Sequence, residues 1–322
     1  MQSSEVMETF GVESPGYVVI RFLMYAGITI FFGSLSLLRI ILPRTSFVPA
    51  GDRDGDTDVR TAIAQRAMRW MGWSLGVLVV VTMLRLAAQH AAFFGSERWS
   101  QATMAPLLLQ TVWGSGLLLA IATLAIAIAG WRVVQSPLVK SHTPGWVLLI
   151  ASAGALAWSA AMSGHPAAAD QQYVAMLVDA LHVISAGGWI GSLALMVGVA
   201  IPVLRTANGS PDHGGIARVV AAFSPVALTF SAVLGATGII ASWRNIGTVN
   251  ALWSSDYGLL LVRKLVIVAV VAAIGLYNWR WVLPRLGQAI GTSRLRRSAT
   301  LEMVAAGVVL ALTALLVATS PP

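Results

Sequence analysis

The sequence predicts an all-α protein, a polytopic membrane helix bundle with eight transmembrane helices. Of its 322 residues, 57% are apolar and only 11% are charged, and the mean hydropathy is +0.77. A soluble globular domain carries about 25% charged residues. The apolar residues gather in long segments of about 20 residues or more, the length that a helix needs to cross a bilayer. A transmembrane barrel would instead show short segments of alternating polarity.

Eight apolar segments follow one another along the chain. No connection between them is long enough for a second folded domain, so we expect residues 1–322 to form a single membrane domain. The predicted transmembrane helices are residues 17–42, 67–93, 104–130, 145–164, 173–204, 217–243, 258–284 and 298–318.

The basic residues indicate how the chain is oriented in the membrane. Thirteen Lys and Arg residues lie in or beside the connections that follow the first, third, fifth and seventh segments, and the other connections hold only Arg98 and Arg244. Cytoplasmic loops carry an excess of Lys and Arg, so we expect both termini on the periplasmic side. The net charge of +8 then reflects the orientation of the chain in the membrane. We expect membrane lipid, and no nucleic acid, among its partners. The absence of cysteine excludes disulfides and thiolate metal sites.

Charged side chains at membrane depth are costly, which makes each of them a candidate for function or for a structural pair. Arg85, Asp179 and Lys264 fall in the outer halves of the second, fifth and seventh segments. Asp179 could form an ion pair with Arg85 or with Lys264, or it could take part in transport. The sequence leaves both interpretations open.

The fifth segment places several candidate ligands on one side of a helix. Met176, Asp179 and His182 follow one another at intervals of three residues, which sets successive members about 60° apart around the helix. Trp189, seven residues beyond His182, returns to the same face. Thioether and imidazole groups together suit copper, and methionine prefers Cu(I).

Further candidates close the neighbouring segments on the same side of the membrane. Met162 and His165 are three residues apart at the end of the fourth segment, and His90 ends the second. At 1.5 Å per residue, His182 lies about 14 Å below the start of its helix, whereas His165 is near the surface. These residues therefore form one site or successive stations on a pathway. The candidate metal ligands are His165, His182, Asp179, Met162, Met176 and His90.

From this hairpin onward, the sequence resembles the CopD (copper resistance protein D) family of bacterial inner-membrane proteins. The resemblance covers residues 145–318 well and the first three segments only loosely. It is carried by Ser163-Gly164-His165, Asp179-x-x-His182, Gly188-Trp189-Ile190-Gly191, Phe223-Ser224-Pro225, Gly235-Ala-Thr-Gly238, Tyr257-Gly258, Lys264, Asn278 and Glu302.

The resemblance implies a multi-pass protein of the inner membrane that is not an enzyme and that takes copper from the periplasm toward the cytoplasm. It also implies a periplasmic CopC-like copper protein as a partner in trans. By the same resemblance, His165 and His182 are the metal ligands, with Asp179 beside them. The polar or aromatic residues expected to support them are Arg85, Lys264, Trp189, Asn278 and Glu302.

A second function class uses the same histidines. Paired histidines on adjacent antiparallel helices can ligate haem iron axially, and CopD-like folds are similar to those of HemJ-type haem proteins. His165 and His182 could then hold haem b in a membrane oxidoreductase. The absorption spectrum of the purified protein distinguishes haem from copper.

Overall fold

The computed structural model describes residues 14–47, 53–95, 97–164, 166, 171–206, 212–282 and 289–322, with the backbone alone at 53–54 and 289–296. This part of the chain is helical and contains no β-strand. Eight of its helices are long and apolar enough to cross a membrane, which confirms the predicted fold class. These spans are Pro15–Arg44, Gly55–Phe94, Val112–Gln135, Thr143–Ala161, Gln172–Thr206, His213–Ile246, Asp256–Val282 and Arg297–Leu316.

Several spans are built from more than one helical element. The elements are α2 (Pro15–Ser36), η1 (Leu37–Ile41), η2 (Leu42–Arg44), α3 (Arg53–Phe94), α4 (Gln101–Leu109), α5 (Val112–Gln135), α6 (Thr143–Ala161), α7 (Gln172–Ala186), η4 (Gly187–Gly191), α8 (Ser192–Leu195), η5 (Met196–Ala200), α9 (Ile201–Thr206), α10 (His213–Ile246), α11 (Ala251–Ser254), α12 (Asp256–Tyr277), η7 (Asn278–Val282) and α13 (Ala289–Leu316).

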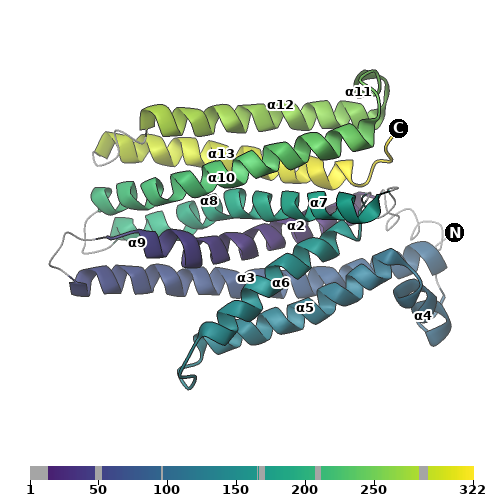
Figure 1. Cartoon of the computed structure of the whole chain (residues 1–322), viewed down its shortest axis with the longest axis horizontal. Helices are drawn as coiled ribbons and strands as arrows, with labels where there is room; N and C mark the ends of the chain where they lie inside the picture. The colour runs from purple at the N-terminus through teal and green to yellow at the C-terminus, as the bar shows by residue number, and fades with distance from the viewer. Residues whose placement is uncertain are drawn as a thin grey trace.

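The first span lies at the centre of the bundle. In Figure 1, α2 runs between a group formed by α10, α12 and α13 and a group formed by α3, α5 and α6. It contacts α3, α6, η4, α8 and α13. In the most apolar 18 residues of this span, 61% of the residues are buried inside the protein. In the corresponding stretch of the span formed by α12 and η7, only 11% are buried. The latter span therefore presents most of its surface to the surrounding lipid.

Two boundaries differ most from those predicted from the sequence. The second span, Gly55–Phe94, takes up nearly all of α3, which begins at Arg53 and not near residue 67. The third span begins at Val112, because the preceding apolar residues form the separate short helix α4. The side chain of Thr111 caps α5 by accepting a hydrogen bond from the Gly114 N–H at 2.8 Å. This local capping starts a new helix where hydropathy alone predicts a continuous one.

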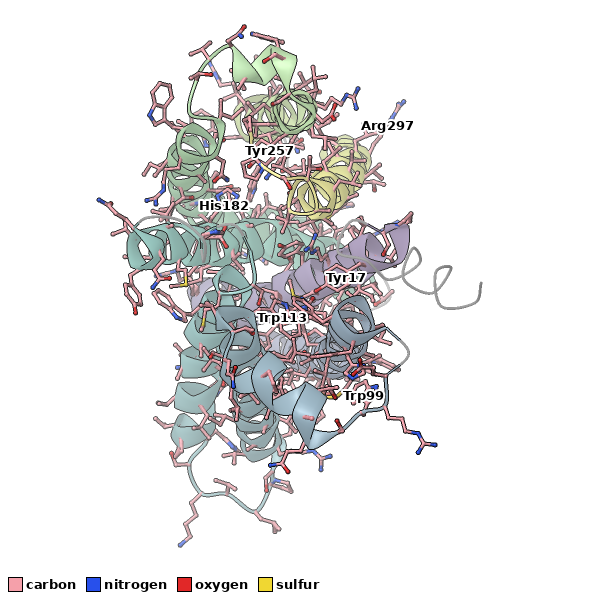
Figure 2. The ribbon with its side chains drawn as sticks, turned by 90° about the vertical axis from the view of Figure 1, so that its right-hand side faces the viewer. Tyr17, Trp99, Trp113, His182, Tyr257 and Arg297 are labelled. Carbon is pink, nitrogen blue, oxygen red and sulfur yellow. The ribbon has the colours of Figure 1, made fainter. Side chains whose placement is uncertain are left out.

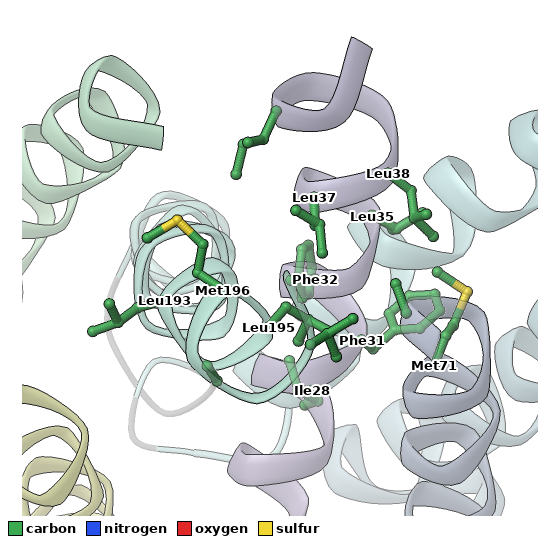
Figure 3. Close-up of a cluster of buried hydrophobic side chains, with 14 of the residues drawn as sticks. Ile28, Phe31, Phe32, Leu35, Leu37, Leu38, Met71, Leu193, Leu195 and Met196 are labelled. Atoms are coloured by element: carbon green, nitrogen blue, oxygen red, sulfur yellow. The ribbon is translucent and has the colours of Figure 1, made fainter. Parts of the chain in front are cut away.

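α2 and η4 cross at very short range because both carry glycine at the crossing. A Cβ atom at Gly33 would lie 2.1 Å from the backbone carbon of Gly191, and one at Gly191 would lie 2.0 Å from the carbonyl oxygen of Thr29. Small residues allow transmembrane helices to approach in this way. Around the crossing, Figure 3 shows Phe31 and Phe32 of α2 with Leu195 of α8 and Met71 of α3 in the buried core.

The fifth span changes its helical winding twice. After α7 the chain forms the π-helical turn η4, continues in α8 and forms a second π-helical turn in η5. Such turns occur often at functional sites, because they rotate the residues on either side relative to each other. The first of them follows directly after the segment that carries Asp179 and His182.

Two arginines, Arg60 and Arg218, connect the helices at the end of the bundle where the first span finishes. The Arg60 guanidinium donates hydrogen bonds to the carbonyl oxygens of Leu42 at 2.7 Å and Thr45 at 2.5 Å. It also pairs with Asp56 at 3.2 Å. Phe47, which is 1% exposed, accepts a hydrogen bond at its carbonyl oxygen from Arg218 of α10. These contacts tie the first span to α3 and α10.

Candidate functional site

Asp179 and His182 lie one turn apart on α7, which packs on α10. His182 Nδ1 is 3.0 Å from Oγ1 of Thr237 on α10. Gly238 makes room for the imidazole, because a Cβ atom there would approach His182 Cε1 to 3.3 Å. In Figure 2, His182 lies toward the same side of the bundle as Tyr257 of α12.

The hydrogen bonds of Thr237 determine the tautomer of His182. The single hydroxyl proton of Thr237 is donated to the carbonyl oxygen of Val233 at 2.7 Å, with that of Leu234 at 3.1 Å. With its proton used in this way, the oxygen of Thr237 can accept from His182, and we assign the proton of the neutral imidazole to Nδ1. In this tautomer, Nε2 carries the lone pair that a metal would bind. This is the arrangement of a metal-binding histidine whose other nitrogen is fixed by a hydrogen bond.

Lys264 of α12 interacts electrostatically with both Asp179 and His182. Within the described residues, Asp179 forms no direct ion pair with either of the two cations that the sequence suggested, Lys264 and Arg85. Lys264 is the cation that acts on it. The positive charge of Lys264 thus compensates the Asp179 carboxylate without a direct ion pair, and no ion pair with Lys264 or Arg85 occupies the carboxylate oxygens.

Two tyrosines complete the surroundings of Asp179. Tyr25 of α2 and Tyr257 of α12 both interact electrostatically with the carboxylate. Tyr257 also accepts a hydrogen bond at its hydroxyl oxygen from Asn245 Nδ2, at 2.9 Å. We refer to Tyr25, Asp179, His182, Thr237, Tyr257 and Lys264 as the α7 polar cluster.

His90 lies elsewhere, at the end of α3. It is 2% exposed, its Nε2 is 3.3 Å from Thr103 Oγ1, and its ring stacks on Trp99 at 4.9 Å between centroids. In Figure 2, Tyr17 marks the position of α2, and Trp99 and His182 lie on opposite sides of it. The structure does not bring His90 to the α7 polar cluster. Its role as a copper ligand stays a prediction.

Three of the predicted ligands remain: His165, Met162 and Met176. His165 lies outside the described residues. Met176 is 3% exposed and buried on α7. Met162 ends α6, where its Cβ lies close to Gly116 of α5. Among the described residues no three His, Asp or Glu side chains are close enough together to hold a metal ion.

The predicted supporting residues fall into four places. Lys264 belongs to the α7 polar cluster. Trp189 lies in η4 and packs against the buried core. Arg85 of α3 is 4% exposed, with its Cζ atom 5.9 Å from the ring centroid of Trp113, and it interacts electrostatically with Tyr25 of the cluster. Asn278 and Glu302 form a separate pair between η7 and α13, in which Asn278 Nδ2 donates to Glu302 Oε2 at 3.2 Å.

Sequence reasoning missed the role of Thr237. The residue belongs to the Gly235-Ala-Thr-Gly238 segment that carries the family resemblance, but its spacing from His182 contains no signal of contact. A polar residue flanked by glycines within an apolar span is the feature that could have indicated it, because small neighbours leave space for a side chain from another helix.

The eight spans and the α7 polar cluster define a multi-pass membrane protein with polar groups held inside the bundle. Comparison of the sequence with known families gives a more specific assignment. The family described as Copper resistance protein D-like, N-terminal domain, matches residues 11–173, and Copper resistance protein D matches residues 217–316. The chain belongs to the copper resistance protein D family.

Two curated relatives agree with this assignment. Copper resistance protein D of Pseudomonas syringae pv. tomato is 27% identical over 96% of this chain and 98% of its own length. Copper transport protein CutJ of Bacillus subtilis (strain 168) is 29% identical over 42% of this chain, and the aligned part spans only 24% of that protein. Neither is named as an enzyme. No solved structure matches the chain. The protein thus has a copper-related function in a membrane.

Proposed function

We propose that the protein carries copper across the bacterial inner membrane, from the periplasm toward the cytoplasm. The observation that carries this proposal is the position of His182, which is hydrogen-bonded through Nδ1 to Thr237 Oγ1 and stands one helical turn from the carboxylate of Asp179. Neutral imidazole suits copper, and a carboxylate adds charge compensation for a divalent ion. Both groups stand inside a span of a chain whose relatives are named for copper resistance and copper transport.

The proposed ligand set extends from His182 toward the beginning of α7. Met176 offers a thioether sulfur on the same helix, two turns from His182. His165 and Met162, at the end of the preceding span, are the proposed ligands nearest the surface. Copper would pass from these to Asp179 and His182, so the residues act as successive stations.

Lys264 regulates this site in the proposed mechanism. Its ammonium group compensates Asp179 when no metal is present, and it repels a cation at His182 Nε2. Copper and Lys264 therefore compete for Asp179. This competition keeps copper binding weak enough for release, a requirement for conduction through a binding site.

The proposed direction is the one that the family resemblance implies, and the charge asymmetry of the connections supports the orientation of the chain in the membrane. Thirteen basic residues on one side against two on the other orient that side toward the cytoplasm. Both termini would then be periplasmic, as would the end of the bundle where α7 begins. A CopC-like periplasmic protein is the proposed donor of copper to this end.

Uptake of copper into proteoliposomes tests the proposal. The wild-type protein is expected to carry copper into vesicles that hold a copper-sensitive dye, and His182→Ala is expected to lose at least 10-fold in initial rate. His142→Ala is the matched control, because His142 is an exposed histidine at the opposite end of the bundle. Equal rates for wild type and His182→Ala, at equal protein content, would overturn the assignment of His182.

The same purified sample tests the haem alternative. Copper transport predicts a preparation without a Soret band and with bound copper after loading. A Soret band that is present in the wild type and lost in His182→Ala would instead assign the histidine to haem iron.

A further inference from the structure

Glu302 is a buried carboxyl group outside the α7 polar cluster. It lies within the last span on α13 and is only 5% exposed. Its partner Asn278 is in the π-helical turn η7 and donates from Nδ2 to Glu302 Oε2 at 3.2 Å. A Cβ atom at Gly275 would lie 3.8 Å from Glu302 Oε1, so the glycine leaves space around the second oxygen.

Asn278 has an unsatisfied acceptor in this pair. Its Oδ1 atom is buried and has no hydrogen-bond partner. A buried polar atom without a partner is destabilising, and each such group in a native structure calls for an explanation, such as a catalytic role or a water or ion that completes its hydrogen bonds. The pair therefore contains one donor fewer than its oxygens require.

No cation compensates the carboxylate in the described part of the chain. Arg280 and Arg297 are the basic side chains nearest in sequence to the pair, and both are exposed. On α12, which packs against α13, Lys264 acts on Asp179 and Arg263 is exposed. On the other elements packed against α13, Arg21 of α2 lies over Tyr17, Arg218 of α10 is bound to Asp212 and the Phe47 carbonyl, and Arg244 of α10 is exposed. None of these forms an ion pair with Glu302. An ionised carboxylate in this place would be buried and without a compensating charge, which is strongly unfavourable.

We propose that Glu302 and Asn278 form a proton-binding site, and that its proton is exchanged as copper crosses the membrane. A proton on the Glu302 carboxyl group removes the uncompensated charge. It also supplies the O–H donor that Asn278 Oδ1 lacks, so the acid and the amide can each donate to the other. The proton is taken up from one aqueous side and released to the other, with no change in oxidation state.

The position of this pair fits a role in coupling. Glu302 is five residues from Arg297, at the end of the bundle opposite to the start of α7. At 1.5 Å per residue, Glu302 and Asp179 lie about 8 Å and 11 Å from opposite ends of their spans. The copper-related part of this inference rests on the proposed transport function, whereas the proton site itself does not.

Infrared spectroscopy of the full chain in membranes tests the proton site without copper. The wild type at neutral pH is expected to show the carbonyl band of a protonated carboxyl group, which Glu302→Gln lacks. Glu97→Gln removes an exposed carboxylate and is expected to leave the band unchanged, while Asn278→Ala is expected to shift it. Glu302→Asp, which keeps a carboxyl group, is expected to retain a shifted band. Identical carboxyl regions in wild type and Glu302→Gln would overturn the proposal.

A pH-sensitive dye inside copper-transporting proteoliposomes tests the coupling. Proton movement is expected to accompany copper uptake in the wild type and to be lost in Glu302→Gln, with copper binding retained. An unchanged ratio of protons to copper in Glu302→Gln would contradict the coupling. A wild type that carries no copper would defeat the transport function, and the infrared band would still decide the proton site.

Discussion

His182 Nδ1 is hydrogen-bonded to Thr237 Oγ1, and this contact joins α7 to α10. The distance is 3.0 Å, and the hydroxyl proton of Thr237 is already used within its own helix. One hydroxyl thus selects the tautomer of a candidate copper ligand. The mechanism proposed for the protein depends on this relationship.

Thr237→Val is expected to weaken copper binding by about 10-fold or more, the usual effect of removing a partner that orients a metal ligand. Valine has the shape of threonine but cannot accept a hydrogen bond from His182 Nδ1. The measurement is a copper titration of the purified protein against a competing chelator. Thr237→Ser keeps the hydroxyl and should bind copper like the wild type. Equal affinity of the valine and serine variants would show that the hydrogen bond does not position the histidine.

Lys264→Gln is expected to raise copper affinity several-fold and to slow copper release. The substitution removes a positive charge that competes with copper for Asp179 and repels a cation at His182. Stopped-flow measurement of copper dissociation, with Lys264→Arg as the charge-preserving control, checks this. Weaker copper binding in Lys264→Gln would show that the lysine supports the site and does not compete with the metal.

Gly191→Ala is expected to destabilise the bundle by about 1–3 kcal/mol, the usual cost of overpacking a tight contact. The added methyl group would meet the carbonyl oxygen of Thr29 at 2.0 Å, and the backbone cannot yield without separating α2 from η4. Gly154→Ala is the matched control, because a Cβ atom there meets nothing within 4 Å. Thermal unfolding in detergent should show a lower midpoint for Gly191→Ala alone.

Arg60→Gln is expected to lower the unfolding midpoint, because it removes charged hydrogen bonds to the carbonyl oxygens of Leu42 and Thr45. Each such bond contributes up to about 1.5–3 kcal/mol, reduced here because the Arg60 side chain is 34% exposed and is partly screened by solvent. Arg66→Gln removes an exposed arginine from the same helix and should change little. Equal unfolding midpoints for the two variants would mean that the hydrogen bonds of Arg60 contribute no stability.

The sequence was sufficient to predict the eight spans, because twenty-residue apolar segments leave few alternatives to membrane helices. It also placed Asp179 and His182 one turn apart on one helix. Residue spacing is reliable within a helix, since 3.6 residues per turn determine which side chains share a face.

Contacts between helices could not be predicted in the same way. The pairing of His182 with Thr237, 55 residues apart, depends on how α7 and α10 pack. His90 was grouped with the other histidines because all three end or enter spans on one side, yet α2 separates it from His182. The break between α4 and α5 depends on the cap formed by Thr111, a local effect that hydropathy does not register.

X-ray absorption spectroscopy at the copper edge tests most directly whether His182 binds copper. Copper-loaded wild type is expected to show scattering from an imidazole ligand, and this contribution should fall in His182→Ala while His142→Ala retains it. An imidazole contribution of equal size in wild type and His182→Ala would contradict the central claim, because copper would then be held by other histidines.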